Sequence, residues 1–440
     1  TWAQLPDPRV WDTNGTVTAI ATSGNSIYLG GDFTFVGPNT GHFVAMDAVS
    51  GLLERGWPRV DGTVNCVAAD GAGGWYVGGR FTLVGSAART NLAHIRSDNT
   101  LDAWNPIVEG AVLTIAVAGS KIYVGGDFTE IGGQLRDRIA CLDASTGFVT
   151  AWNPGANSPV QALVVNGSSV FAGGLFTKIG GEPRRYIAEL DVGTGQASDW
   201  DAGAGYVVYA LALEGSTLYA GGYFSFIGGQ TRHHIAALDV SSGLATAWNP
   251  DASSPDGAGA SIQSIIVNGS NVFVGGIFAR IGGENRGNLA ELDVTSGLAT
   301  EWNPGADGAV QTIALSGSML YAGGTFSHAG GENRRNLASV SASTGQVSAW
   351  NPGASDAVLG LAVHGSTVVA GGQFSILGGK DRARIAEFDA RTGTATSWNP
   401  GADNLVLTLA VGGSSVYAGG DFTHIGGQAR SRIAALDATS

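Results

Sequence analysis

Short apolar segments recur along the chain, and they follow one another in a fixed order. A first segment, such as "VQALVV" at 160–165, is followed by a Gly-Ser turn and a second segment, "VFAGGLFT". The third segment is "YIAELD", and a fourth segment ends at a tryptophan. Short apolar runs separated by turn residues, without helical periodicity, predict antiparallel strands joined by hairpins.

The phenylalanine of a "GGxF" motif marks each repeat of this order. Successive phenylalanines lie 47 or 48 residues apart, except for one interval of 54 between Phe224 and Phe278. A period in this range is typical of β-propellers. We therefore expect an all-β, closed propeller of nine four-stranded blades, with eight as the alternative count, in a single domain over residues 1–440. The nine markers are Phe33, Phe81, Phe128, Phe176, Phe224, Phe278, Phe326, Phe374 and Phe422.

The tryptophans indicate how the ring closes. Eight of them follow their phenylalanine by 23 or 24 residues, but the last repeat stops at "IAALDATS" without one. A spare tryptophan, Trp11, stands before the first apolar segment. We therefore predict that residues 1–11 supply the outer strand of the last blade by pairing with 432–437, which leaves no open edge.

Two of the recurring residues have structural interpretations. The aspartate of "LDASTG" precedes a Thr-Gly turn, where its carboxylate accepts hydrogen bonds from turn amides and needs no catalytic role. Each repeat tryptophan is expected to fill the seam between neighbouring blades, and a surface that stacks on sugars is the alternative. The turn aspartates are Asp143, Asp191, Asp239, Asp293, Asp389 and Asp437, with Ser341 as a substitute.

An arginine also recurs, eight residues after the phenylalanine. We expect it to bond to loop carbonyl groups or to stack on the tryptophan. The alternative is an electropositive ring that binds anionic glycans. The set is Arg89, Arg136, Arg184, Arg232, Arg286, Arg334, Arg382 and Arg430.

Composition and charge limit the partners. Charged residues make up 13% of the chain, glycine contributes 70 of 440 residues, and the net charge is -13. A chain without a basic patch argues against nucleic acid or an anionic membrane as the ligand. Cys66 and Cys141 stand where other repeats have alanine, so we expect small core residues and neither a disulfide nor a metal site. The seven histidines show no zinc spacing, and we predict no metal and no cofactor.

The region "AALDVSSGLATAW" at 236–248 resembles the tryptophan-docking motif of the quinoprotein propellers, although the tryptophan comes one residue later here. The longer pattern "YVGGDFTEIGG…IACLDASTG…WNP" is similar to the delta-60-type propeller repeats of bacterial secreted proteins and to the repeats of fungal cortical-marker ectodomains. The resemblance implies a propeller in an extracellular or cell-surface setting, and it carries over no catalytic residue. No apolar run has the length of a membrane span. If the protein is secreted, its signal peptide is not present in this chain.

Repeats four to six depart most from the common pattern. The segment "WDAGAGYVVY" at 200–209 adds Tyr206 near Tyr223, and residues 251–261 form the one insertion. Aromatic and imidazole side chains combine flat apolar surface with polar groups, as a glycan or peptide contact requires. The candidate ligand-binding residues are Tyr206, Tyr223, His233, His234, Tyr186, Arg184 and Arg232, and no catalytic residue is identified.

These observations favour a secreted or cell-surface, non-catalytic propeller that binds a glycan or an extracellular protein, or that serves as a structural module. A carbohydrate-active enzyme, either a polysaccharide lyase or a hydrolase, is the alternative from a different class. A quinoprotein-like redox enzyme is a third possibility, which an absorbance spectrum of the purified protein would test.

Overall fold

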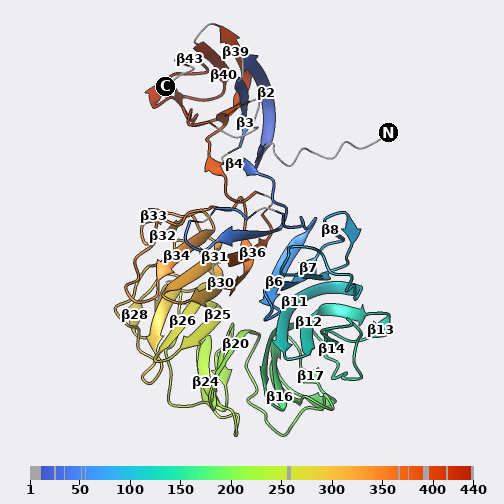
Figure 1. Ribbon diagram of the computed structural model, residues 1–440. Coiled ribbons are helices and arrows are strands. Elements are labelled where there is room, and N and C mark those ends of the chain that lie inside the picture. Colours follow the sequence, from blue (N-terminus) through green and yellow to red (C-terminus); the bar gives the residue numbers. More distant parts are fainter. Residues whose placement is uncertain are drawn as a thin grey trace. The chain divides into compact units, whose positions relative to one another are not determined.

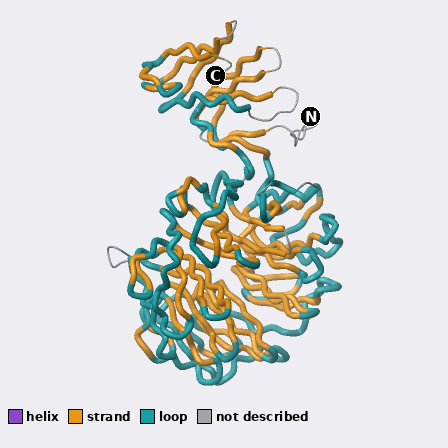
Figure 2. The backbone as a smooth tube through the Cα atoms, turned by 60° about the vertical axis from the view of Figure 1, so that its left-hand side comes forward, coloured by secondary structure: helices purple, strands orange, loops and turns teal. Residues whose placement is uncertain are grey.

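The computed structural model describes residues 11–437 except 24–25, 34, 51, 55, 255–258, 365–366, 375, 390–395 and 413–414. All elements in these ranges are β-strands (Figure 1 and Figure 2). No helix that could span a membrane occurs in this part of the chain. The chain divides into two compact units, a larger one over 42–351 and 357–373 and a smaller one over 1–41, 352–356 and 374–440.

The larger unit contains seven antiparallel sheets, each built from a first, a second and a third strand with the second strand in the middle. The first strands are β6 (Thr63–Ala69), β11 (Val108–Ala118), β15 (Val160–Asn166), β20 (Val208–Glu214), β25 (Ser261–Asn268), β30 (Ala309–Ser316) and β35 (Val358–His364). The second strands are β7 (Trp75–Arg80), β12 (Lys121–Ile131), β16 (Ser169–Gly174), β21 (Thr217–Gly222), β26 (Asn271–Ile277), β31 (Met319–Thr325) and β36 (Thr367–Gly372). The third strands are β10 (Leu92–Ile95), β14 (Ile139–Asp143), β19 (Ile187–Asp191), β24 (Ile235–Asp239), β29 (Leu289–Asp293), β34 (Leu337–Ser341) and β5 (Phe43–Asp47).

A short hairpin stands between the second and third strands of most repeats. These hairpins pair over only two residues on each side. They are β8 (Leu83–Val84) with β9 (Ala87–Ala88), β17 (Lys178–Ile179) with β18 (Glu182–Pro183), β22 (Phe226–Ile227) with β23 (Gln230–Thr231), β27 (Arg280–Ile281) with β28 (Glu284–Asn285), β32 (His328–Ala329) with β33 (Glu332–Asn333), and β41 (His424–Ile425) with β42 (Gln428–Ala429). In the second sheet the end of β12 pairs with β13 (Gln134–Leu135) in the same way.

The paired glycines of the second strand permit close approach within and between sheets. A Cβ atom at Gly173 would lie 2.7 Å from Cγ1 of Val208 in the next sheet, and one at Gly174 would lie 2.2 Å from the carbonyl oxygen of Pro159. The first strand also shifts register here, between Val160 and Ala162. Any side chain at these positions would separate the strands, so the repeated "GG" is a packing requirement.

The seven sheets of the larger unit pack in one continuous series. The first strand of each sheet contacts the first and second strands of the sheet before it, from β6 through β11, β15, β20, β25 and β30 to β35. β35 in turn contacts β6, so the contacts return to the first sheet (Figure 1).

Two repeats exchange their third strands. β5 pairs with β36, with Phe43 opposite Gly371, so the seventh sheet joins the first and eighth repeats. β38 (Ile385–Asp389) makes the same pairing with β3 (Ser26–Asp32) in the smaller unit, with Ile385 opposite Gly30. The sequences "FVAMD" and "IAEFD" share one apolar pattern and end on aspartate, so either strand fits either partner in the same register.

The smaller unit contains two three-stranded sheets of the same kind. One consists of β2 (Thr16–Ser23), β3 and β38, and the other of β39 (Val406–Gly412), β40 (Ser415–Gly420) and β43 (Ile433–Asp437). β39 contacts β2 and β3, which repeats the packing of the larger unit. A third small sheet joins β1 (Trp11–Thr13), β4 (Phe35–Pro38) and β37 (Lys380–Asp381).

The structure confirms an all-β array of antiparallel repeat sheets, but it does not confirm one closed ring of nine four-stranded blades. Seven sheets complete a series of contacts without the other two, because the third strands of repeats one and eight are exchanged. The expected fourth strand is a single bridge in most repeats, such as Leu142 to Val149, because a turn precedes it and the tryptophan loop follows at once. Trp11 pairs with Pro38 and not with 432–437, and the rest of the predicted N-terminal strand lies outside the described residues.

Seven of the eight repeat tryptophans are buried, as predicted, whereas Trp57 is only partly buried, and six of the seven donate a hydrogen bond to the next sheet. The Nε1 of Trp152 donates a 2.9 Å hydrogen bond to the carbonyl oxygen of Asp191, and the indole contacts the ring of Tyr123 edge to face. This geometry excludes these indoles as sugar-stacking surfaces. The same bond joins Trp200 to Asp239, Trp248 to Asp293, Trp302 to Ser341, Trp350 to Asp47 and Trp398 to Asp437.

The turn aspartates are caps, as predicted. Oδ1 of Asp143 accepts hydrogen bonds from the hydroxyl and amide groups of Ser145 and Thr146, and these bonds lower the pKa of Asp143 to about 2. Asp191, Asp239 and Asp293 accept equivalent bonds. The turns after Asp389 and Asp437 lie outside the described residues.

Candidate functional site: a cluster of tyrosines and histidines

Five of the seven predicted site residues come together in the structure. We call Tyr186, Tyr206, Tyr223, His233 and His234 the tyrosine–histidine cluster. Ring centroids lie 5.5 Å apart between Tyr186 and Tyr206, and 6.1 Å apart between Tyr206 and Tyr223. Tyr223 lies 5.5 Å from His234, which lies 6.4 Å from His233. The cluster is thus a continuous row of aromatic rings.

The row is built from the connections of two neighbouring sheets. Tyr186 directly precedes β19, His234 directly precedes β24, and Tyr223 directly follows β21. Tyr206 comes from the loop between Trp200 and β20, which joins the two sheets. The backbone fixes these positions, since the amide of Tyr223 donates to the carbonyl of Val207 over 2.9 Å.

Tyr186 and His234 occupy a backbone position that other repeats fill differently. The tenth residue after the phenylalanine has a positive φ angle in eight repeats, 66° at Tyr186 and 67° at His234. At this position the side chain of Asn288 links its own strand connection to the joining loop. Its Oδ1 accepts from the amide of Phe278, and its Nδ2 donates to the carbonyl of Ala306 in the joining loop. The same position is filled by Asn91, Arg138, Asn336, Arg384 and Arg432.

A bulky side chain at this position strains the backbone. Asparagine tolerates the left-handed region, whereas a bulky residue there costs about 1–3 kcal/mol. Tyr186 bears that cost, whereas histidine tolerates the region as asparagine does, and the two residues place rings against Tyr206 and Tyr223. Across the eight repeats this position reads Asn, Arg, Tyr, His, Asn, Asn, Arg and Arg. This variation is a sequence signal that the prediction of the site did not use.

The loop that carries Tyr206 also lacks the aspartate that accepts backbone hydrogen bonds in an equivalent loop. In an equivalent loop Asp307 accepts from the amides of Ser327 and His328, each over 2.8 Å. Gly205 stands at that position before Tyr206, and only its backbone amide bonds, to Phe226 over 2.7 Å. The result is that 47% of Tyr206 is exposed to solvent, and Tyr223 is 41% exposed.

The two histidines have different surroundings. Nδ1 of His233 lies 2.6 Å from Oδ1 of Asp251, and both side chains are about half exposed. Nδ1 of His234 is buried and has no hydrogen-bond partner among the described residues. Burial, followed by the neighbouring His233, lowers the pKa of His234, so its ring is neutral at neutral pH. The row therefore has one unused imidazole nitrogen beside its tyrosines.

Arg184 and Arg232 act inside the repeats. The guanidinium of Arg232 donates to the carbonyls of Thr231 and Thr246, and Arg184 bonds to Pro183 and Ser198 in the same way. These bonds hold the outer segment of each repeat before its tryptophan, which agrees with the structural interpretation of the arginine series. Arg89, Arg136, Arg286, Arg334 and Arg382 make the same bonds.

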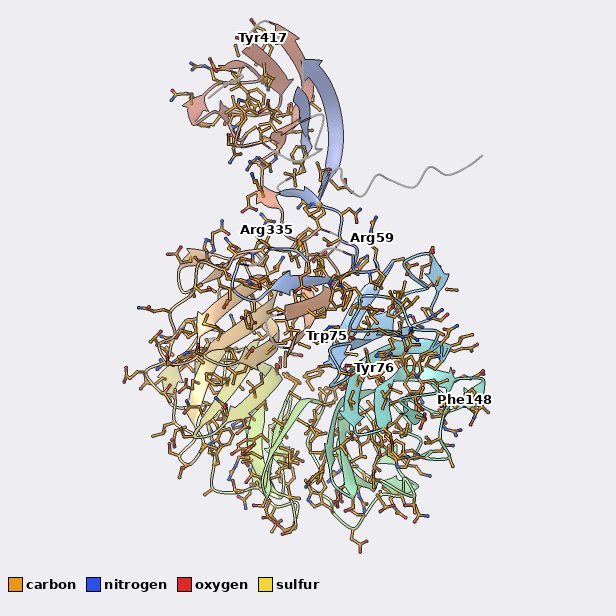
Figure 3. All side chains as sticks on the ribbon, in the orientation of Figure 1. Arg59, Trp75, Tyr76, Phe148, Arg335 and Tyr417 are labelled. Carbon is orange, nitrogen blue, oxygen red and sulfur yellow. The ribbon has the colours of Figure 1, made fainter. Side chains whose placement is uncertain are left out.

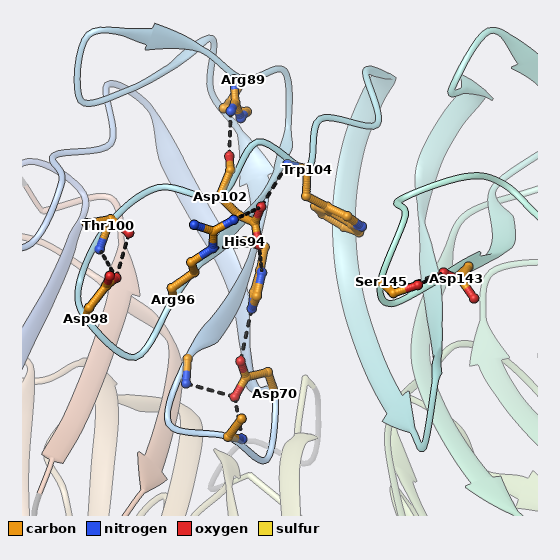
Figure 4. Close-up of polar contacts among 12 residues, drawn as sticks. Asp70, Arg89, His94, Arg96, Asp98, Thr100, Asp102, Trp104, Asp143 and Ser145 are labelled. Atoms are coloured by element: carbon orange, nitrogen blue, oxygen red, sulfur yellow. Dashed lines mark hydrogen bonds and ion pairs between the residues drawn. The ribbon is translucent and has the colours of Figure 1, made fainter.

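The structure also contains a charged network that sequence reasoning missed (Figure 4). Nε2 of His94 lies 3.0 Å from Asp70, and its Nδ1 lies 3.0 Å from Asp102, which also accepts two bonds from Arg96. The segment "RSDNTLD" replaces the Asp-x-x-Thr-Gly turn in this repeat and supplies Arg96 and Asp102. Both nitrogens of His94 are bonded to carboxylates, so the imidazole is held within this network.

In the ranges that the structure describes, no group of three or more His, Cys, Asp and Glu side chains is arranged to hold a metal ion. Cys66 and Cys141 are both free thiols, and Cys141 is buried as predicted.

Comparisons with known proteins identify a family. A family model described as outer membrane protein assembly factor BamB matches residues 60–351, and this match supports the likeness to quinoprotein-type propeller repeats. Among solved structures, the computationally designed Ika8 protein is 18% identical, with a TM-score of 0.47, over 83% of this chain and 96% of the designed chain. No curated protein matches the sequence.

Proposed function

The chain belongs to the family described as outer membrane protein assembly factor BamB, and we propose that it is a non-catalytic binding propeller of the bacterial envelope. In this proposal the seven sheets of the larger unit form a rigid propeller. Its tyrosine–histidine cluster holds an extended segment of a protein partner. The family is named for the assembly of outer-membrane proteins, which is why the proposed partner is a protein in that compartment.

The observation that carries the proposal is the row of exposed rings between two neighbouring sheets. Tyr206 and Tyr223 contact each other beside the positions at which other repeats have the asparagine that links strand and loop and the aspartate that caps the loop. Tyrosine is enriched in protein interfaces because it offers a large apolar area with a polar end and loses little conformational freedom on binding.

The arrangement of the rings favours a peptide over a glycan. The rings of Tyr186 and Tyr206 are inclined by 57°, and those of Tyr206 and Tyr223 by 80°. Crossed rings leave spaces that accept individual side chains, whereas a sugar stacks on an open flat face. The guanidinium groups of Arg184 and Arg232 are also not available to bind an anionic glycan, since both bond to backbone carbonyls of their own repeats.

A direct binding experiment tests this function. The probes are fluorescent decapeptides with alternating aromatic and polar residues, the pattern of transmembrane β-strands, and a panel of neutral oligosaccharides. The double variant Tyr206→Ala/Tyr223→Ala is compared with Phe148→Ala, which removes an exposed ring from a different sheet. We expect peptide binding that the double variant weakens at least about tenfold, equivalent to about 1.4 kcal/mol, and that the control leaves unchanged.

The other outcomes identify the alternatives. Binding of oligosaccharides alone would assign glycan recognition, and release of new reducing ends from a polysaccharide would assign a carbohydrate-active enzyme. Equal peptide binding by the wild type and the double variant would show that the cluster is not the site.

A further inference from the structure

The strands of the larger unit are buried on both faces by their neighbours. In the sheet of β12, Tyr123 and Ile139 point toward the next sheet, where they pack in one core cluster with Val160 and Leu163. The residues equivalent to Tyr123 and Ile139 are also buried in the following sheets. They are Phe171 and Ile187, Tyr219 and Ile235, Phe273 and Leu289, and Tyr321 and Leu337.

The sheet of β39, β40 and β43 differs on this one face. Tyr417 and Ile433 hold the equivalent positions, but they are 47% and 71% exposed. Figure 3 labels Tyr417 on this sheet. On the opposite face Val416 and Ala434 are buried in a core cluster with Ile385 of the neighbouring sheet. The sequence of this sheet is therefore that of a sheet covered on both sides, and the described residues of the smaller unit cover one side.

A glycine on the same face has no neighbouring sheet against it among the described residues of the smaller unit. A Cβ atom at Gly125 would lie 2.7 Å from Val160 of the next sheet, and one at Gly323 would lie 2.6 Å from Val358. At Gly419 the closest atom is Cγ2 of Thr408 in its own sheet, at 2.8 Å. The face therefore has the same glycine and the same flanking apolar side chains as the faces on which sheets pack in the larger unit. The valine that packs against the equivalent glycines there has no counterpart among the described residues here.

We propose that a second copy of this chain covers the face. In the pair, the β2–β3–β38 sheet of each copy packs on the Tyr417 face of the other copy. The fitting occupant is another repeat, because the first strand of a following repeat covers the equivalent faces in the larger unit. Two copies of the smaller unit bring four sheets together, which is the smallest usual number of propeller blades.

Two-fold symmetry accounts for both contacts at once. Each copy supplies one docking face and one covering sheet, so a single two-fold axis satisfies both copies and leaves no further face for a third. The exchange of β5 and β38 is what produces this unit, since it separates two sheets from the series of seven. The proposal is independent of the tyrosine–histidine cluster and stands or fails without it.

The test is the mass of the full chain in solution, measured by sedimentation velocity over a dilution series. We expect a species of twice 44.6 kDa that the double variant Tyr417→Glu/Ile433→Glu converts to the monomer. The matched control is Leu135→Glu/Phe148→Glu, which places the same charges at exposed apolar residues of the larger unit. The control should retain the dimer.

Hydrogen exchange of the wild type guards against a variant that fails to fold. Amides of β40 and β43 should become more protected as the protein concentration rises through the dimerisation range. Two results overturn the proposal. A monomer whose β43 amides are protected at every concentration would mean that the same chain covers the face. A monomer whose β43 amides exchange freely would mean that the face stays open.

Discussion

The Nε1 of Trp302 donates a 2.8 Å hydrogen bond to the carbonyl oxygen of Ser341, across the boundary between two successive sheets. Trp104 holds the equivalent position two sheets before Trp200, yet its Nε1 is buried without a hydrogen-bond partner in the described part of the chain. The pair therefore separates the contribution of the hydrogen bond from that of the buried ring.

Replacing these tryptophans with phenylalanine should have unequal effects. Trp302→Phe leaves the carbonyl of Ser341 without this donor, and it should lower the free energy of unfolding by about 1–3 kcal/mol. Trp104→Phe removes no hydrogen bond and should cost less, whereas Trp302→Ala should cost about 3–5 kcal/mol. Urea unfolding followed by circular dichroism measures all three. Equal costs for the two phenylalanine variants would show that the bond to Ser341 contributes nothing.

The network around His94 should make the free energy of unfolding depend on pH in the acid range. Burial opposes ionisation of Asp102, but hydrogen bonds from Arg96 and His94 prevail and lower its pKa to about 2. A carboxylate whose pKa is lower in the folded state than in the unfolded state stabilises the fold at pH values above its unfolded-state pKa of about 4. It loses that contribution as the pH falls toward about 2. The difference in urea midpoint between wild type and Asp102→Asn should therefore shrink between pH 5 and pH 2.5. A difference that stays constant over this range would contradict the assignment.

Tyr186→Asn should stabilise the protein while it weakens binding. Asparagine adopts the positive φ angle more readily, and at Asn288 it ties the strand to the joining loop. We expect a gain of about 1 kcal/mol in the free energy of unfolding. Thermal melting measures this gain, and Asn288→Tyr is the reciprocal variant, which should lose a similar amount. A destabilised Tyr186→Asn would show that the ring at this position is a core residue and not a strained surface group.

Periodic features of the structure could be predicted from the sequence because each repeat applies the same constraint. The strand order, the buried tryptophans and the capping by Asp143 all follow from residues that recur at fixed spacing. The exchange of β5 and β38 could not be predicted, since "FVAMD" and "IAEFD" fit the same register and no local pattern chooses between them. The ring of nine blades was therefore the natural expectation.

The candidate site was predicted from the places where the repeats disagree, and its role in ligand binding stays a prediction. Tyr206 and Tyr223 depart from the common pattern, and the structure places them in contact. Arg232 was assigned to the same site because an arginine at a fixed offset has the same sequence signature whether it bonds inward or faces a ligand. The pairing of His233 with Asp251 was missed, because it joins two connections that only the fold brings together.

The measurement that tests the central claim most directly is the binding stoichiometry, determined by calorimetry with the decapeptide that binds most tightly. The tyrosine–histidine cluster occurs once among the residues that the structure describes, so we predict one site per chain and loss of the binding heat in Tyr206→Ala/His233→Ala. The control Phe148→Ala should bind like the wild type. A stoichiometry near nine per chain, or a full binding heat in the double variant, would show that the repeated elements bind the ligand and would contradict the account.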